Sequence, residues 1–163
     1  MEVFLIRHTK TAVIPGTCYG NSDVDVADSF LEEAGKVRER LKGESFDAVY
    51  SSPLQRCRKL AVYCGYENPI LDDRLKELNF GSWEGQRWDE IQDPRLQEWY
   101  DDWLSMPAGG AESFLEQLND PLIFILFVAV AISLLLREDG TREGVCIRSR
   151  RDDPGGIDLC RKI

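Results

Sequence analysis

Residues 3–9 read VFLIRHT, an apolar run that ends in an arginine and a histidine. The apolar part does not alternate with polar residues, which predicts a strand buried on both faces of a sheet. In open α/β sheets, ligands bind beyond the carboxyl ends of the strands. Arg7 and His8 therefore stand where a binding site is expected.

The next stretch of the chain carries a helix signal. Residues 28–43 predict a helix, with Ser29 and Glu32 as a capping box and Gly43 as the residue that ends it. Apolar side chains recur along this stretch at helical spacing, which predicts one buried face.

Strand and helix signals then alternate. Residues 46–50 and 69–71 predict two short strands, and residues 53–65 predict a helix capped by Ser52. Residues 88–106, which are rich in tryptophan and acidic residues, predict another helix. This order favours a parallel sheet with helices on both faces. We therefore expect an α/β fold of three layers, α/β/α, around a mostly parallel central sheet.

Composition limits the classes of function. The 163 residues, 43% of them hydrophobic, have the size and make-up of one globular domain. The net charge of -9 opposes binding to phosphate backbones, so no nucleic-acid partner is expected. Five cysteines without a CxxC pair, and an apolar strand in place of a secretory signal, favour a reducing, cytoplasmic location. Because the chain has a single histidine, neither a metal site nor another cofactor is expected.

An arginine follows two of the predicted strands. Arg7 and Arg56 each offer a fork of donors that matches phosphate oxygens, and a neutral imidazole such as His8 can attack phosphorus. Together they would bind a phosphate monoester. However, a single histidine after a strand is more often structural, and an arginine in the first turn of a helix usually lies at the surface. Spacing alone leaves both interpretations open.

Four motifs stand in order along the chain: LIRHTKT at 5–11, CYGNSD at 18–23, SSPLQR at 51–56 and ELNFGSWEG at 77–85. In their order and spacing they resemble the motifs of the histidine phosphatase (phosphoglycerate mutase-like) superfamily, over about residues 1–119. The Arg-His-Thr start and the Leu-Asn-Phe-Gly stretch are most similar to its α-ribazole phosphatases, which act in cobalamin assembly.

This resemblance implies a phosphomonoester hydrolase with a phosphohistidine intermediate and a small-molecule phosphate ester, such as α-ribazole 5′-phosphate, as substrate. His8 would be the nucleophile, and Arg7 and Arg56 would clamp the phosphoryl group. Asn21 would add an amide to the phosphate pocket. Glu77 would protonate the leaving alkoxide, a role that needs a carboxyl kept protonated by burial or by nearby negative charge.

The C-terminal part departs from the superfamily, which has a second histidine there, whereas this chain has none after His8. Residues 122–136 are almost wholly apolar, but they fall short of the roughly 20 residues of a bilayer span, so a buried helix or strand is expected. The charged tail that follows shows no period. We interpret residues 1–163 as a single domain in which 120–163 is a divergent or out-of-frame segment.

Other functions remain open at this stage. A broad sugar-phosphate phosphatase or a mutase would use the same motifs. A phosphate-binding pseudoenzyme would keep Arg7 and Arg56 without turnover, since the second histidine is missing. A membrane-associated protein that uses residues 122–136 is the least favoured alternative, and the oligomeric state leaves no signal in the sequence.

Overall fold

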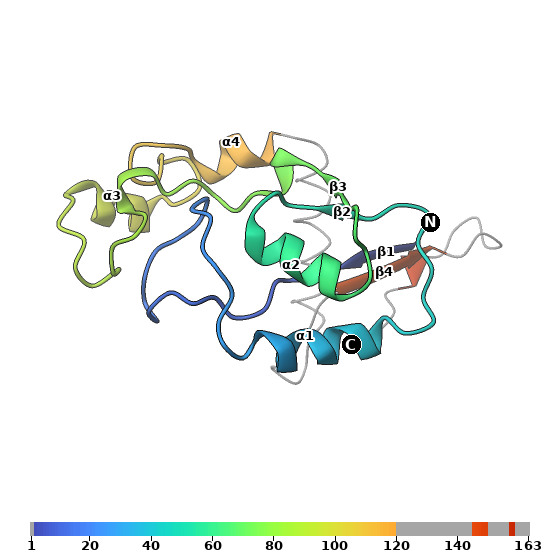
Figure 1. The fold of residues 1–163 in the computed structure, drawn as a ribbon. Helices are drawn as coiled ribbons and strands as arrows, with labels where there is room; N and C mark the ends of the chain where they lie inside the picture. Colours follow the sequence, from blue (N-terminus) through green and yellow to red (C-terminus); the bar gives the residue numbers. More distant parts are fainter. Residues whose placement is uncertain (1, 120–144, 150–156, 159–163) are drawn as a thin grey trace. The chain divides into compact units, whose positions relative to one another are not determined.

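The computed structural model describes residues 2–119, 145–149 and 157–158 (Figure 1). The chain divides into two compact units, one of Met1–Arg7 with Pro121–Ile163 and the other of His8–Asp120.

The first unit contains a sheet of three strands in the order β1-β4-β5. Its strands are β1 (Glu2–Leu5), β4 (Val145–Ser149) and β5 (Ile157–Asp158), and each neighbouring pair is antiparallel. The strand predicted at the start of the chain is confirmed. Its described partner is antiparallel, whereas the sequence predicted a mostly parallel sheet. Because β1 stands at the edge of this order, its residues 3–5 are half-buried rather than enclosed.

The tail also differs from expectation, because β4 and β5 lie where no regular structure was predicted. β4 begins with Val145, Cys146 and Ile147, an apolar stretch of the kind that favours strands, and it pairs with β1 from Val145 to Arg148. The apolar run 122–136 lies outside the described residues. Within residues 2–119 and the two described tail strands, no helix is long and apolar enough to span a membrane.

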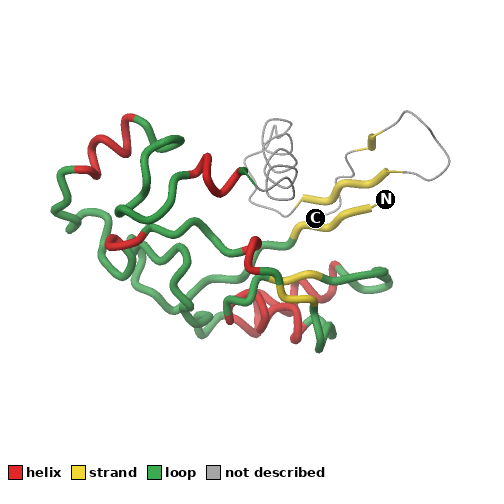
Figure 2. Tube along the Cα trace, turned by 90° about the horizontal axis from the view of Figure 1, so that it is seen from above, coloured by secondary structure: helices red, strands yellow, loops and turns green. Residues whose placement is uncertain are grey.

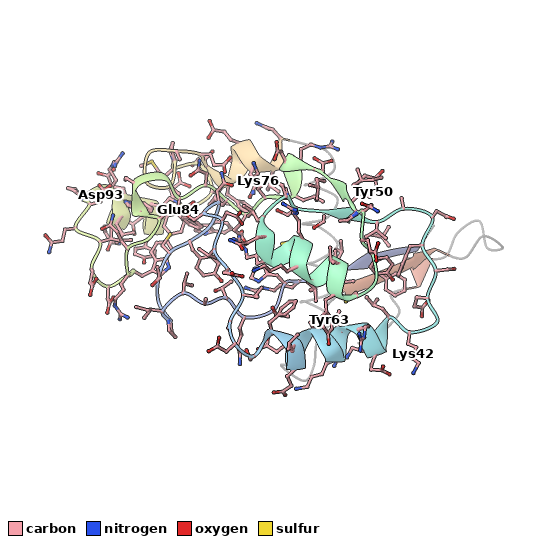
Figure 3. The ribbon with its side chains drawn as sticks, viewed as in Figure 1. Lys42, Tyr50, Tyr63, Lys76, Glu84 and Asp93 are labelled. Carbon is pink, nitrogen blue, oxygen red and sulfur yellow. The ribbon has the colours of Figure 1, made fainter. Side chains whose placement is uncertain are left out.

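The second unit begins with an alternation of helices and short strands. The order is α1 (Phe30–Arg40), β2 (Tyr50–Ser51), α2 (Gln55–Tyr63) and β3 (Ile70–Leu71). β2 and β3 are parallel, as the sequence predicts. The rings of Phe30 on α1 and Tyr63 on α2 pack edge to face with their centroids 5.6 Å apart, and Figure 3 shows Tyr63 between these helices. Loops and turns connect these elements over much of the unit (Figure 2).

Both helices form where predicted, but their first turns differ from expectation. Ser29 does not cap α1 with Glu32: its hydroxyl donates to Glu33 at 2.6 Å, while Glu32 pairs with Lys36. α2 begins two residues later than predicted, because Leu54 is its N-cap. Positive φ angles at Gly43 and Gly65 follow the helix ends, in agreement with the predicted stops.

The helix predicted over residues 88–106 is confirmed only in its middle part, and the structure has turns and loops on either side of it. The structure has two 3-10 turns, η1 (Asp73–Leu75) and η2 (Gly81–Trp83), and two short helices, α3 (Arg95–Asp101) and α4 (Phe114–Leu118). Pro94 is the N-cap of α3, and a proline disfavours helical backbone in the residue before it. The helix therefore begins only after Pro94, and residues 88–93 form a turn at 88–90 followed by loop.

The core of this part of the chain is built on residues far apart in sequence. Its buried members are Cys18, Leu78, Trp83 and Ala108, and partly buried side chains pack around them, namely Phe80, Trp88, Ile91, Leu96 and Trp99. The indoles of Trp88 and Trp99 stack with their centroids 6.0 Å apart. This cluster gives the loops between residues 77 and 113 a fixed shape.

Candidate phosphate site

His8 opens the second unit. Its ring is half-buried, and Nδ1 lies 2.7 Å from the carbonyl oxygen of Thr9. A carbonyl can only accept, so Nδ1 carries the proton in this contact and the ring's lone pair is on Nε2. Thr9 is buried, and its hydroxyl has no hydrogen-bond partner among the described residues.

The chain after His8 runs along a loop formed by residues 20–27. Ala12 donates to the carbonyl of Asp25 at 2.9 Å, and Ala27 donates to the carbonyl of Lys10 at 2.9 Å. At its other side, this 20–27 loop is bonded to the start of α2: Asp23 accepts from the backbone N–H of Gln55 at 2.6 Å. One loop therefore links the segment that carries His8 to the helix that carries Arg56.

Arg56 is the charged centre of this arrangement. Its side chain is 1% exposed, and its two terminal nitrogens donate to Gly20 O at 2.7 Å and to Ser22 O at 2.8 Å. The ring of Tyr19 lies 5.3 Å from the guanidinium carbon. These partners, taken from the described residues, carry no negative charge. A guanidinium has five N–H donors, so three remain beyond the two used here, and Nε is buried without an acceptor.

A buried cation without an opposite charge is unfavourable unless an anion binds to it. The sequence prediction that Arg56 is a phosphate ligand therefore agrees with the electrostatics of its site. The local sequence explains its position, because Ser51 and Ser52 at the end of β2 are buried and Pro53 turns the chain into α2.

Asn21 lies in the turn that Arg56 holds, so the structure brings these two predicted residues together. Glu77 differs from expectation: it is exposed, and its carboxylate accepts weakly from the backbone N–H of Leu78 at 3.4 Å. Its negative charge still reaches the start of α2, because it contributes to the raised pKa of Cys57. Arg7 is exposed and is the last residue of the first unit, so its role stays a prediction.

The thiols near the site are not activated. Burial is the largest cause that raises the pKa of Cys57, and it outweighs the nearby Arg56 charge and a hydrogen bond from Ser52. Burial, together with the charge of Glu84, raises the pKa of Cys18 to about 12. Within the part of the chain that the structure describes, no group of three histidine, cysteine or carboxylate side chains is placed to hold a metal.

Glu84 is a residue of this site that the sequence reasoning did not single out. Its carboxylate accepts from the backbone of Asn21 at 2.8 Å, of Ser22 at 2.6 Å and of Phe80 at 3.0 Å, and also from the Ser22 hydroxyl. These bonds hold its pKa below the usual range, although burial acts the other way. A carboxylate between an apolar tryptophan and a glycine in the stretch GSWEG was the available signal.

Trp83 is a core residue and not an accessible side chain of the site. It is 1% exposed, and its Nε1 donates to Asp93 at 2.9 Å. Asp93 also pairs with Arg95, and the two contacts hold the pKa of Asp93 well below its usual value. Residues 107–113 form a tight loop closed by a hydrogen bond from the backbone N–H of Ala108 to the carbonyl of Glu112.

Comparison with known proteins decides the family. The model of the histidine phosphatase superfamily (branch 1) matches residues 3–120. This chain belongs to that superfamily. The match ends where the composition of the sequence changes.

Individual curated members of the superfamily are similar to part of this chain, over part of their own length. The chain is 27% identical over 126 residues to phosphoserine phosphatase 1 of Hydrogenobacter thermophilus, which covers 73% of this chain and 60% of that protein. It is 30% identical over 118 residues to adenosylcobalamin/alpha-ribazole phosphatase of Escherichia coli, covering 68% of this chain and 58% of that protein. The chain thus spans less than two thirds of the length of these curated relatives.

The fold is shared with solved structures. TTHB049 from Thermus thermophilus superposes with a TM-score of 0.69 at 23% identity, over 98% of each chain. YhfR from Bacillus stearothermophilus superposes with a TM-score of 0.72 at 20% identity, over 97% of this chain and 94% of its own. At these identities the likeness establishes the α/β fold alone.

Proposed function

We propose that this protein binds the phosphoryl group of a small phosphate monoester and hydrolyses the ester through a phosphohistidine intermediate. The observation that carries the proposal is the buried Arg56 guanidinium, which has donors left over and no anionic partner among the described residues. A phosphate oxygen would accept hydrogen bonds from the remaining donors and would also supply the opposite charge. Family membership supplies the reaction class.

In the proposed reaction, Nε2 of His8 attacks phosphorus, and the bond from phosphorus to the ester oxygen breaks. The contact from Nδ1 to Thr9 O supports this role, because it keeps the lone pair on Nε2. Glu77, which is exposed, takes up a proton from solvent and gives it to the leaving alkoxide. A water molecule then attacks the phosphohistidine and gives one proton to the Glu77 carboxylate, so that inorganic phosphate is released and both His8 and Glu77 are restored.

The other predicted residues act on the phosphoryl oxygens. Arg56 and Arg7 would neutralise the charge that these oxygens carry in the transition state, and the Asn21 amide would add a neutral donor. Removal of one such donor typically slows catalysis by about 100-fold to 1000-fold. We place these roles in a three-layer α/β/α domain located in the cytoplasm.

The alcohol half of the substrate is proposed to be α-ribazole, so that the ester is α-ribazole 5′-phosphate. The Arg-His-Thr start, the Leu-Asn-Phe-Gly stretch and the likeness to the Escherichia coli alpha-ribazole phosphatase support this choice. The comparable likeness to a phosphoserine phosphatase supports a second ester class, so both esters belong in the assay.

One observation favours a second candidate function. The chain contains one histidine, so the second imidazole of the superfamily's site has no counterpart. The alternative is a pseudoenzyme that binds phosphate without turnover. We propose that residues 120–163 are divergent or translated out of frame, which the end of the family match at residue 120 supports. Translation of the coding DNA in the other two frames tests this: a His-Gly codon pair in the last third supports it, and its absence from both frames contradicts it.

Hydrolysis of p-nitrophenyl phosphate, α-ribazole 5′-phosphate and phosphoserine by the full chain tests the catalytic proposal. We expect turnover of at least one ester, its loss in His8→Ala, and a phosphorylated protein in rapidly quenched wild-type samples only. Turnover that persists in His8→Ala contradicts the mechanism. Phosphate binding by both proteins without turnover selects the pseudoenzyme.

A further inference from the structure

We infer that Glu84 is a positioning residue for phosphate binding, which acts by fixing the turn whose carbonyl oxygens orient Arg56. The inference rests on the proposed role of Arg56 as a phosphate ligand. Glu84 itself does not contact the ligand in this account. Figure 3 shows Glu84 on the α3 side of the second unit, together with Asp93.

The peptide group between Gly20 and Asn21 connects the two charges directly. Its N–H donates to Glu84 Oε1 at 2.8 Å, and its C=O accepts from Arg56 Nη2 at 2.7 Å. In a trans peptide these two groups point in opposite directions, so the anion and the cation lie at opposite ends of one dipole. Each charge strengthens the hydrogen bond that the other end makes.

Ser22 also bonds to both charges, through the two peptide groups on either side of its Cα atom. Its N–H donates to Glu84 Oε2 at 2.6 Å, while its C=O accepts from Arg56 Nη1 at 2.8 Å. The two terminal nitrogens of the guanidinium thus bond to a turn whose N–H groups are held by Glu84. The plane of the guanidinium, and with it the direction of its remaining donors, depends on this turn.

The turn packs tightly against the segment that carries Glu84. A Cβ atom on residue 20 would lie 2.1 Å from Leu78 O and 2.5 Å from the Phe80 ring, so the backbone at Gly20 is pressed against the segment that leads to Glu84. On the other side of this segment, Gly85 donates to the carbonyl of Cys18 at 2.8 Å. Glu84 therefore lies where it can bond to the turn without any rearrangement of the backbone.

Hydrogen bonds from the protein stabilise the negative charge of Glu84. Each of its carboxylate oxygens accepts two hydrogen bonds, Oε1 from Asn21 and Phe80 and Oε2 from Ser22 twice. An amide in its place would turn an NH₂ group toward backbone N–H donors, and the turn would lose half of these bonds. Glu84→Gln is therefore a sharp test that preserves size.

Glu112 provides a matched control. Its carboxylate accepts from the backbone N–H of Asn79 at 2.5 Å, so it holds the same segment by the same kind of bond. It makes no recorded contact with residues 20–22 or with Arg56 among the described residues. Glu112→Gln therefore measures how much phosphate affinity changes when such a bond is lost away from the Arg56 site.

The experiment is a calorimetric titration of the folded, full-length protein with inorganic phosphate at pH 7. We expect Arg56→Lys to weaken binding about 100-fold, since Lys lacks the fork of donors. Glu84→Gln is expected to weaken it about 10-fold, as outer contacts of binding residues do, while Glu112→Gln changes it less than twofold. In Arg56→Lys, adding Glu84→Gln is expected to cause no further loss, because Glu84 acts through Arg56.

The outcomes separate the two proposals. If Arg56→Lys binds phosphate as the wild type does, the proposed function fails. If Arg56→Lys is impaired and Glu84→Gln is not, the function stands and the positioning role is overturned. Independent, multiplying losses in the double variant also overturn it. Should Glu84→Gln fail to fold, Glu84→Asp keeps the charge with a shorter reach, and an unchanged affinity there overturns the inference.

Discussion

Arg56 and Trp83 are both large side chains at 1% exposure, yet they are buried in different ways. Trp83 has one polar atom, and Asp93 accepts its hydrogen bond. Arg56 donates to two backbone oxygens and keeps further donors, of which Nε has no acceptor among the described residues. Trp83 is thus a satisfied neutral group that stabilises the fold, whereas unmet hydrogen-bonding capacity on a buried cation indicates an anionic ligand. The contrast assigns a structural role to Trp83 and a binding role to Arg56.

The largest effect is expected at Trp83, where the comparison predicts a loss of stability. Trp83→Ala removes the centre of the aromatic cluster, and we expect the free energy of unfolding to fall by about 3–5 kcal/mol. Urea denaturation followed by circular dichroism measures it. A loss below about 1 kcal/mol would show that the cluster is not the core of this unit.

Arg56→Met is expected to cost less stability than Trp83→Ala and to remove the response to phosphate. Gly20 O and Ser22 O lose their donors, which we expect to cost about 1–3 kcal/mol. In the wild type, phosphate should raise the melting temperature, because it binds the folded state only. Differential scanning calorimetry with and without phosphate compares the two proteins. A phosphate-dependent rise that persists in Arg56→Met would contradict the assignment.

Asp93→Asn tests the structural role of Trp83 through a substitution with a smaller expected effect on stability. The substitution weakens the bond to Trp83 Nε1 and the ion pair with Arg95, both of which depress the pKa of Asp93. We expect a small fall in melting temperature at pH 7 and an unchanged phosphate affinity. A change in phosphate affinity would show that the contacts of Trp83 are coupled to the Arg56 site, which would contradict the separate roles assigned to them.

The smallest effect concerns the pH dependence contributed by Glu84. Its pKa is lowered in the folded state, so its stabilising contribution is present above the unfolded value of about 4.3 and is lost as the pH falls through the folded value. The melting temperatures of wild type and Glu84→Gln should therefore differ most above about pH 5 and converge toward pH 3. A constant difference over this range would mean that the charge of Glu84 has no part in its role.

Parts of this fold follow from local sequence. The sequence predicted the strand in the apolar run at residues 3–6 and the helices that end before Gly43 and Gly65. These elements depend on neighbouring residues, because an apolar run favours a strand and a glycine ends a helix. The helix predicted over 88–106 forms only at Arg95–Asp101, because Pro94 disfavours helical backbone in the residue before it. The stacking of Trp88 on Trp99 joins a residue before this helix to one within it, and a tertiary contact of this kind leaves no periodic signal.

The residues of the site likewise divide into those that the sequence identifies and those that depend on tertiary contacts. Arg56, Asn21 and His8 stand in motifs that can be read directly, and in the structure Arg56 bonds to the residues on either side of Asn21. Glu84 could not be identified from spacing, because its bonds to Asn21 and Ser22 cross more than 60 residues of sequence. The exposure of Glu77 is likewise a property of the folded chain.

The central claim is that the buried Arg56 guanidinium receives the phosphate group. The most direct test is a two-dimensional NMR spectrum of the arginine Nε–Hε groups during titration with inorganic phosphate at pH 7. We predict that one signal, absent from Arg56→Lys, moves downfield as its proton gains an acceptor, and that it saturates at the calorimetric affinity. Phosphate that binds while this signal stays in place would contradict the account.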